Sequence, residues 1–390
     1  MYRIQTLNKI SPVGLSRFDA DRYLVNETEA SPDALLVRSA KLLDYSFPDS
    51  LLAIARAGVG VNNIPLERCS EAGIVVFSTP GANANAVKEL VLCAMLMGSR
   101  DVPGAIRWVR EQAASGVEVS TVVEKGKSAF VGPEVYKKAL GIIGLGAIGA
   151  LVANAAIAMG MDVYGYDPYL SVDNALRLDR HIHVVKDVND LYKRADYITI
   201  HIHYTPQTEH LINADAIAHM KRGVRFINLA RGEIVDDEAM LSALDTGWVA
   251  TYVTDFPNNR LLTSPHVIAM PHLGASTPES EQNCAVMAVD QLREYLENGN
   301  IRASVNLPNV SMSPSGVMRL CILHRNVPNM LASITTLFGK DGVNVENLSN
   351  KSSGAYAYTL VDLGTRVEES VVEELRALPN VIRVRTIQWN

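Results

Sequence analysis

Five side chains that bind ions or exchange protons directly follow short apolar runs: Asp167, His201, Arg231, Asp255 and His272. An imidazole takes up and returns protons near neutral pH, whereas a guanidinium stays charged and binds carboxylates through two parallel hydrogen bonds. The apolar runs have the length and residue types of buried strands. Because ligands of parallel sheets bind beyond the carboxyl ends of the strands, these residues predict a single site at one sheet edge.

One stretch, Ala139–Asp167, holds an apolar run, a glycine turn, a helical pattern and a second apolar run. Its glycines, Gly144, Gly146 and Gly149, form G-x-G-x-x-G, and Asp167 follows the last of them by 18 residues. The first glycine allows a tight turn, the second lets backbone approach a pyrophosphate, and the third lets helix and strand pack closely. With Asp167 placed to accept hydrogen bonds from ribose hydroxyls, the stretch predicts a dinucleotide site.

The residues after Asp167 favour NAD over NADP, because Pro168 and Tyr169 follow it and no Arg is present to meet a 2′-phosphate. A membrane span is the rival interpretation, since Ala139–Met161 is 23 residues without a charge. The glycines and small residues of this stretch favour a buried core instead, and no signal peptide or lipidation motif accompanies it. We therefore expect a cytoplasmic protein without a membrane partner.

Composition narrows the classes of partner. A net charge of −6 and an isoelectric point near 5.9 give no basic face for nucleic acid, so a small-molecule substrate is expected. At 390 residues the chain should hold two or three domains. The four cysteines are far apart and form no C-x-x-C pair, which favours buried free thiols over disulfides, a metal site or a nucleophile.

Apolar runs alternate with helical patterns along most of the chain, which predicts doubly wound parallel sheets in two Rossmann-like domains. The expected strands are Ala34–Val37, Leu52–Ala55, Gly73–Phe77, Ala139–Ile143, Asp162–Tyr166, Tyr197–His201, Val224–Asn228, Ala250–Thr254 and Val267–Met270. One long helix is expected from Val87 to about Arg110, crossing from the first domain into the second. The Pro, Ser and Asn content of Leu307–Gly316 predicts a linker to a further domain.

Residues 317–390 show a different order of elements. The expected sequence is a strand at Val317–Leu323, a helix at Met330–Gly339, strands at Val343–Ser349 and Ala355–Asp362, a helix at Glu368–Leu378 and a strand at Val381–Ile387. This βαββαβ order over about 70 residues is that of a ferredoxin-like module.

With these residues in view, the chain resembles the D-isomer-specific 2-hydroxy acid dehydrogenases nearly end to end. The most specific segments are RAGVGVNNI (Arg56–Ile64), TPGANANAVKEL (Thr79–Leu90), GLGAIG (Gly144–Gly149), INLARGEIVDDEA (Ile227–Ala239) and PHLGAST (Pro271–Thr277). The resemblance implies a substrate domain at residues 1–92 with a return segment at 277–305, and an NAD-binding domain at 93–276. Members that act on a phosphorylated acid further imply an ACT domain at 317–390.

The resemblance implies oxidation of a 2-hydroxy acid, with His272 as the base and Arg231 as the carboxylate-binding cation. The implied cofactor-binding residues are Gly144, Gly146, Ala147, Ile148, Gly149, Asp167, His201, Leu229, Ala230, Arg231, Asp255, His272, Gly274 and Ala275. The implied substrate-binding residues are Arg38 and Ser39 for the phosphate, Val59 and Gly60 through their backbone, Asn83, and Lys127 from a loop that a partner subunit contributes. No metal site is expected.

One position departs from the family pattern. A Glu usually stands five residues past the position of Asp255, where it hydrogen-bonds the catalytic His, but this chain has Arg260 there. Either another acid serves, with Glu279 and Glu281 nearest in sequence, or His272 works without a carboxylate, which is our hypothesis. The alternatives for function are another D-2-hydroxy acid dehydrogenase or hydroxypyruvate reductase, and a non-catalytic nicotinamide-sensing regulatory protein.

The resemblance also implies regulation and assembly. His324, Asn326 and Asn344 match positions that hold an amino-acid effector between two ACT domains, which makes L-serine the expected effector, although Asn329 replaces the family's Gly. The alternative is that this module only joins subunits. A homodimer or homotetramer is expected in either case.

Overall fold

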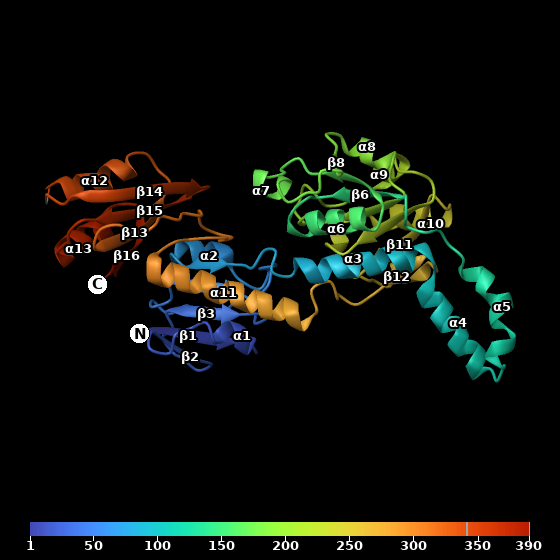
Figure 1. The fold of residues 1–390 in the computed structure, drawn as a ribbon. Coiled ribbons are helices and arrows are strands. Elements are labelled where there is room, and N and C mark those ends of the chain that lie inside the picture. The colour runs from blue at the N-terminus through green and yellow to red at the C-terminus, as the bar shows by residue number, and fades with distance from the viewer. Residues whose placement is uncertain (341, 390) are drawn as a thin grey trace. The chain divides into compact units, whose positions relative to one another are not determined.

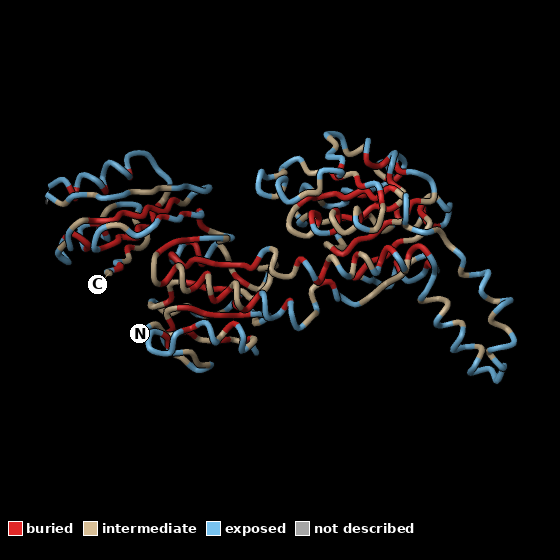
Figure 2. The backbone as a smooth tube through the Cα atoms, viewed as in Figure 1, coloured by how far each residue is buried: buried red, intermediate tan, exposed pale blue. Residues whose placement is uncertain are grey.

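The computed structural model describes residues 1–340 and 342–389 (Figure 1). By internal contacts the chain divides into a terminal unit, residues 1–83 and 281–390, and a central unit, residues 84–280. In the part of the chain described, no helix combines the length and apolar character needed to cross a bilayer. Each unit has its own buried cores, which Figure 2 marks in red.

The central unit is built on a seven-stranded parallel sheet in the order β12-β11-β10-β9-β6-β7-β8. Its strands are β6 (Ala139–Ile143), β7 (Asp162–Tyr166), β8 (His183–Val184), β9 (Tyr197–Ile200), β10 (Val224–Asn228), β11 (Val249–Thr254) and β12 (Val267–Ala269). The four middle strands are apolar and buried on both faces, as strands of a sheet covered by helices should be. This confirms the predicted doubly wound architecture.

Helices cover both faces of this sheet. The longer ones are α3 (Ala84–Ser99) and α6 (Ala147–Ala158), which form one core with β6, and α8 (Val188–Tyr192), α9 (Ala214–Ala218) and α10 (Asp237–Asp245), which form the other. The short ones are α7 (Val172–Ala175), η3 (Gly232–Ile234) and η4 (Leu261–Thr263). All the connections between parallel strands therefore run over a face, and the strand ends stay open for polar loops.

The single helix expected over Val87–Arg110 is wrong. The structure has two helices there, α3 and α4 (Val102–Ala114), and both lie in the central unit. Pro103 lacks the N–H that a helix interior needs, and Asp101 caps the new helix by accepting a hydrogen bond from the Gly104 N–H at 2.9 Å. A further segment of short helices follows α4, namely η1 (Val119–Thr121), α5 (Val123–Gly126) and η2 (Lys127–Phe130).

The terminal unit contains a five-stranded parallel sheet in the order β2-β1-β3-β4-β5. Its strands are β1 (Tyr2–Leu7), β2 (Tyr23–Asn26), β3 (Ala34–Val37), β4 (Ala53–Arg56) and β5 (Val75–Phe77), and its helices are α1 (Pro12–Leu15), α2 (Leu66–Glu71) and α11 (Pro278–Asn298), the last starting in the central unit. One face packs with α11 and the other with α2. Two of these strands, β1 and β2, were not predicted from the sequence.

The C-terminal residues of the terminal unit form a four-stranded antiparallel sheet in the order β14-β15-β13-β16. Its elements are β13 (Met318–Arg325), α12 (Met330–Lys340), β14 (Val345–Ser353), β15 (Tyr356–Leu363), α13 (Glu369–Ala377) and β16 (Val381–Gln388). The βαββαβ order is as predicted. One face of the sheet packs under α12 and α13, and residues of the other join the core around α11.

Two further expectations need correction. The predicted linker, Leu307–Gly316, is not a free connection, because Leu307, Val310 and Met312 are buried in the terminal-unit core. The four cysteines are free thiols, but Cys93 is exposed on α3 while the other three are buried. The composition of Leu307–Gly316 predicted a linker, but its three apolar residues pack into the core and hold the segment in place.

Candidate active site

The glycine turn after β6 has the geometry of an anion-binding helix start. Gly144 has a φ of +92°, and a Cβ there would lie 2.5 Å from the His201 carbonyl oxygen. A Cβ on Gly149 would lie 1.9 Å from the Gly144 carbonyl oxygen, so helix and turn pack too closely for any side chain. Around Gly146, by contrast, nothing described lies within 4 Å of such a Cβ, and no side chain caps α6. The first-turn N–H groups thus face a space that suits a pyrophosphate.

Asp167 lies at the end of β7 and is held in place by backbone. One carboxylate oxygen accepts a hydrogen bond from the Leu145 N–H at 2.9 Å and the other from the Tyr169 N–H at 2.8 Å. An ionised carboxylate has about four acceptor positions, so each oxygen retains capacity for a ribose hydroxyl. The expected role of Asp167 in binding the cofactor ribose stays a prediction, and these two hydrogen bonds leave the carboxylate free to fulfil it.

His201 follows β9 and is neutral. Burial lowers the pKa of its imidazole to about 3, because the charged form would lose its hydration. Its Nε2 lies 3.1 Å from the Thr199 hydroxyl, whereas its buried Nδ1 has no hydrogen-bond partner among the residues described. A neutral ring of this kind can position a ligand, but it cannot serve as a base that is regenerated near neutral pH.

Asp255 follows β11 and orders the loop that carries His272. One of its carboxylate oxygens accepts hydrogen bonds from the Leu273 N–H at 3.1 Å and the Gly274 N–H at 2.9 Å. The other is buried and finds no partner within the described chain, in a residue only 1% exposed. Burial raises the pKa of Asp255 despite the two backbone donors. An unpaired buried acceptor at this place fits the amide group of a nicotinamide, so these residues suit NAD.

Arg231 and His272 flank one aromatic ring, that of Phe256. The Arg231 guanidinium carbon lies 5.8 Å from the ring centroid, and the His272 ring centroid lies 4.7 Å from it at an interplanar angle of 49°. One guanidinium nitrogen of Arg231 donates to the Ala230 carbonyl at 2.6 Å, which leaves its remaining donors for a ligand. Sequence reasoning missed Phe256, and its only signal was its place directly after Asp255.

Arg260, which stands where the family pattern has a Glu, pairs with a carboxylate of α10. Its guanidinium pairs with Glu238 of α10 at 3.1 Å. Glu281 pairs with Arg38 at 2.5 Å within the terminal unit, and Glu279 is exposed at the start of α11. Among the described residues Asp255 interacts electrostatically with His272, and the hypothesis of a base without a carboxylate stays a prediction.

The residues expected to bind substrate lie in the terminal unit, apart from Lys127. Arg38 and Ser39 follow β3, and the Asn8 side-chain oxygen accepts a hydrogen bond from the Ser39 N–H at 3.0 Å. Val59 and Gly60 lie in the loop after β4. Asn83 ends the unit, and its side-chain oxygen is buried without a partner among the described residues. Lys127 lies in η2 of the central unit, exposed and paired with Glu124.

The expected effector residues lie on the four-stranded sheet or in its loops. His324 is 2% exposed, and its ring nitrogens lie 2.9 Å from the Thr359 hydroxyl and 2.8 Å from the Arg325 carbonyl. Burial lowers the pKa of His324 although the contact to that carbonyl opposes the shift. Asn326 and Asn344 are more exposed and donate to the Gly354 carbonyl and to Glu346, at 3.1 and 2.9 Å. The His324 ring is thus committed to contacts within the chain.

Comparison with known proteins places this site in a family. Residues 92–274 match the model of the D-isomer specific 2-hydroxyacid dehydrogenase NAD binding domain. The chain is 36% identical over 296 residues to D-3-phosphoglycerate dehydrogenase of Methanocaldococcus jannaschii, which covers 74% of this chain and 54% of that protein. It is 32% identical over 352 residues to D-3-phosphoglycerate dehydrogenase of Escherichia coli, which covers 87% of this chain and 82% of that protein. The chain therefore spans about half the length of the first relative and most of the second.

A solved structure shows the same fold. The NADPH-dependent glyoxylate/hydroxypyruvate reductase of Sinorhizobium meliloti is 23% identical, and the match covers 78% of this chain and 98% of that one with a TM-score of 0.65. The glycine turn, Asp255 and the Arg231–Phe256–His272 arrangement all lie within residues 92–274, the range that the NAD-binding model matches. Together with the match over most of the Escherichia coli protein, this shows that the chain belongs to the D-isomer-specific 2-hydroxyacid dehydrogenase family.

Proposed function

We propose that the chain catalyses the NAD-dependent oxidation of D-3-phosphoglycerate to 3-phosphohydroxypyruvate, the first step of L-serine biosynthesis. The observation that carries this proposal is the match to a D-3-phosphoglycerate dehydrogenase over 82% of that protein's length. Arg231 and His272 against the Phe256 ring support it, because a fixed cation and an imidazole are the groups that oxidation of a 2-hydroxy acid requires.

In the proposed mechanism His272 takes the proton of the substrate's C2 hydroxyl as the C2–H bond breaks, and the C–O bond becomes a carbonyl. NAD, which the glycine turn, Asp167 and Asp255 would hold, would supply the acceptor for the hydride and its two electrons. Arg231 binds the substrate carboxylate and stabilises the carbonyl oxygen. The His272 imidazolium then gives its proton to solvent, or returns it to the carbonyl oxygen in the reverse direction.

Arg38 is proposed to bind the substrate phosphate, helped by Ser39, Asn83 and a partner subunit's copy of Lys127. Glu281 holds Arg38 at 2.5 Å, but both side chains are nearly half exposed, 46% and 44%. Exposed ion pairs of this kind contribute about 0–1 kcal/mol to stability. A substrate phosphate can therefore replace Glu281 as the partner of Arg38 with little loss of free energy. The pair would keep Arg38 extended until the substrate arrives.

The test is NADH oxidation with 3-phosphohydroxypyruvate, measured beside hydroxypyruvate and 2-oxoglutarate. We expect a strong preference for the phosphorylated acid, and we expect the His272→Ala variant to lose turnover while it still binds NADH. Equal or faster turnover of hydroxypyruvate would make the protein a reductase of unphosphorylated acids. No turnover with any of the three acids would favour the nicotinamide-sensing alternative.

We further propose that residues 317–390 form an ACT domain whose paired copies bind L-serine. The βαββαβ order and the exposed Asn326 and Asn344 support this proposal. Isothermal titration with L-serine tests it, with Asn344→Ala as the variant expected to lose binding. If titration of the parent protein with L-serine releases or absorbs no heat, the alternative that this module only joins subunits is favoured.

Homo-oligomerisation is part of the same proposal. Helix α4 has no buried residue along its 13 positions, and Ile106 and Val109 are 52% and 40% exposed. Apolar side chains left exposed in this way favour a helix that packs against a second copy of the chain. Sedimentation equilibrium is expected to give a dimer or tetramer. A cytoplasmic location is proposed as well, because free thiols suit a reducing compartment.

A further inference from the structure

A cavity of about 550 Å³ lies in the terminal unit, and its lining includes none of the residues expected to bind substrate, although Asn83 directly follows the lining residue Ala82. One wall is a face of α11, and the rest of the lining is Gly81, Ala82, Asn300 and Arg302. The α11 residues in the wall include Val286, Met287, Asp290, Gln291 and Glu294, a spacing of three and four that keeps them on one side of the helix. The cavity is large enough for a small metabolite.

Gln291, one of the lining residues, carries an unsatisfied polar atom. It is 8% exposed, and its amide nitrogen donates to the Ser78 carbonyl at 2.8 Å, which fixes the orientation of the side chain. Its amide oxygen is buried and has no hydrogen-bond partner in the part of the chain described. Buried acceptors without a donor are unfavourable, so a donor brought by a ligand would compensate this one.

Glu294 supplies a negative charge that its neighbours do not neutralise. Its carboxylate accepts hydrogen bonds from the Asn300 amide at 2.6 Å and from the Asn298 amide at 3.2 Å, and both donors are uncharged. Asp290 differs, because Arg17 pairs with it at 2.7 Å. Glu294 is therefore the carboxylate of this wall best suited to a cationic ligand group.

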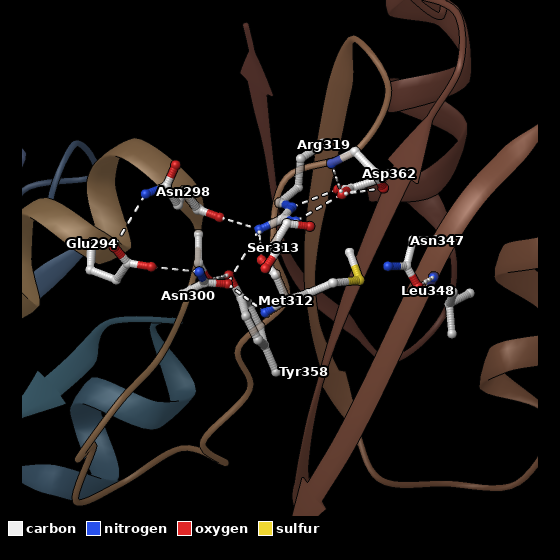
Figure 3. A network of polar contacts seen from close by, with 12 residues as sticks. Glu294, Asn298, Asn300, Met312, Ser313, Arg319, Asn347, Leu348, Tyr358 and Asp362 are labelled. Atoms are coloured by element: carbon white, nitrogen blue, oxygen red, sulfur yellow. Dashed lines mark hydrogen bonds and ion pairs between the residues drawn. The ribbon is translucent and has the colours of Figure 1, made fainter.

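Glu294 belongs to a network of hydrogen bonds around Asn300 (Figure 3). The Asn300 side-chain oxygen accepts hydrogen bonds from the Met312 N–H at 3.0 Å and from the Arg319 guanidinium at 3.2 Å, while its amide nitrogen bonds Glu294. Asn300 is 3% exposed, so this chain of contacts fixes the carboxylate before any ligand arrives. Preorganisation of this kind lowers the entropic cost of binding.

The remaining lining is a cation and apolar surface. Arg302 is exposed, and two of its guanidinium nitrogens contact the Ser311 hydroxyl at 2.9 and 3.3 Å. A guanidinium held by a neutral hydroxyl keeps its full charge for a carboxylate. Val286, Met287 and Ala82 add apolar surface to the lining.

We propose that this cavity is a second ligand site, which binds a small α-amino acid with an aliphatic side chain. The ligand's ammonium group lies against Glu294 and the Gln291 oxygen, its carboxylate faces Arg302, and its side chain packs on Val286 and Met287. The opposite charges of the lining fit a zwitterion, and neither a simple amine nor a simple carboxylate uses both of them.

Isothermal titration with L-valine tests the proposal against two truncated probes, isovalerate without the ammonium and isobutylamine without the carboxylate. We expect saturable binding of one L-valine per chain, and at least tenfold weaker binding of either truncated probe. Glu294→Gln keeps an acceptor for Asn300 but removes the charge, and it should weaken L-valine binding at least tenfold. Glu374→Gln, the same change on an exposed position of α13, should leave binding unchanged.

Two results would overturn the proposal: an L-valine affinity that Glu294→Gln does not change, and an absence of saturable binding at millimolar concentration. Loss of L-valine binding in Asn344→Ala would equally refute it, because the ligand would then occupy the four-stranded sheet. Arg302→Met is a second variant expected to weaken L-valine while sparing isobutylamine. Since titration needs no turnover, its outcome is independent of the proposed dehydrogenase activity.

Discussion

Replacement of Arg319 by Met should loosen the four-stranded sheet more than any other single change in it. Arg319 and Asp362 are both fully buried and form two hydrogen bonds, at 2.6 and 2.8 Å (Figure 3). The guanidinium also donates to the carbonyls of Asn298, Met312 and Ser313 at 2.7 to 3.2 Å. One side chain therefore joins β13 to β15, to the end of α11 and to the segment before β13.

The magnitude follows from what the Met variant leaves behind. Asp362 would keep only the Ser315 N–H and hydroxyl as donors, at 2.8 and 3.1 Å, and would lose its counter-charge. Removing one partner of a buried ion pair costs about 3–5 kcal/mol, because the other charge stays buried. For a module of this size that corresponds to a fall in melting temperature of roughly 10 °C or more.

Hydrogen exchange measures this effect locally. Amides of β13 and β15 in Arg319→Met should exchange about a hundred to several thousand times faster than in the parent, whereas β6 of the central unit serves as an internal control. The double variant Arg319→Met with Asp362→Leu should recover most of the loss, since it removes both charges. A change below tenfold in the single variant would refute the reasoning. Failure of the double variant to recover would show that packing, not the unpaired charge, is the cause.

Three further predictions concern the candidate active site. In steady-state assays, Arg38→Ala should raise KM for 3-phosphohydroxypyruvate about 10- to 100-fold and leave KM for hydroxypyruvate unchanged. An equal rise of KM for both acids would contradict a contact between Arg38 and the phosphate. Gly149→Ala places a Cβ 1.9 Å from the Gly144 carbonyl, so NADH affinity and melting temperature should fall, while Gly339→Ala, whose Cβ meets nothing within 4 Å, should be neutral. Burial raises the pKa of Asp255 in the folded protein. At a pH between the pKa of the unfolded chain and that of the folded protein, the native state therefore binds more protons than the unfolded state. The free energy of unfolding then falls as the pH rises through this window. Asp255→Asn should therefore melt higher than the parent near pH 7 but not near pH 4, and a lower melting temperature at pH 7 would contradict this.

The bounds of the buried strands could be predicted from the sequence, because buried strands are apolar along their whole length. Strands Ala139–Ile143 and Val224–Asn228 have the bounds predicted from their apolar runs, because both faces of each are covered and the sequence has to be continuous in apolar residues. Edge strands escape this rule. In β2, with the sequence YLVN, only the first residue is buried, so its pattern resembles that of a loop.

The site could be predicted as a set of residues but not as a set of contacts. The positions of Asp167 and Asp255 follow from their places after strands, which a parallel sheet fixes. Which oxygen of Asp255 is satisfied depends on the backbone of residues 273–274, and no local pattern encodes that. The pairing of Arg38 with Glu281 joins residues 243 positions apart, so it depends on the tertiary fold alone.

Arg260 and the surroundings of His272 depend on tertiary contacts that the sequence does not reveal. The resemblance implies a Glu at this position and the chain has Arg260 there, but the sequence does not say which group this cation binds. The structure shows that the Arg260 guanidinium pairs with Glu238 of α10 at 3.1 Å. What contacts the imidazole instead is the Phe256 ring, which also lies under Arg231. An apolar ring can fix the position of an imidazole, but it does not stabilise the protonated form as a carboxylate would. For the base proposed above, we therefore expect packing against Phe256 to set the orientation of the ring and not its pKa.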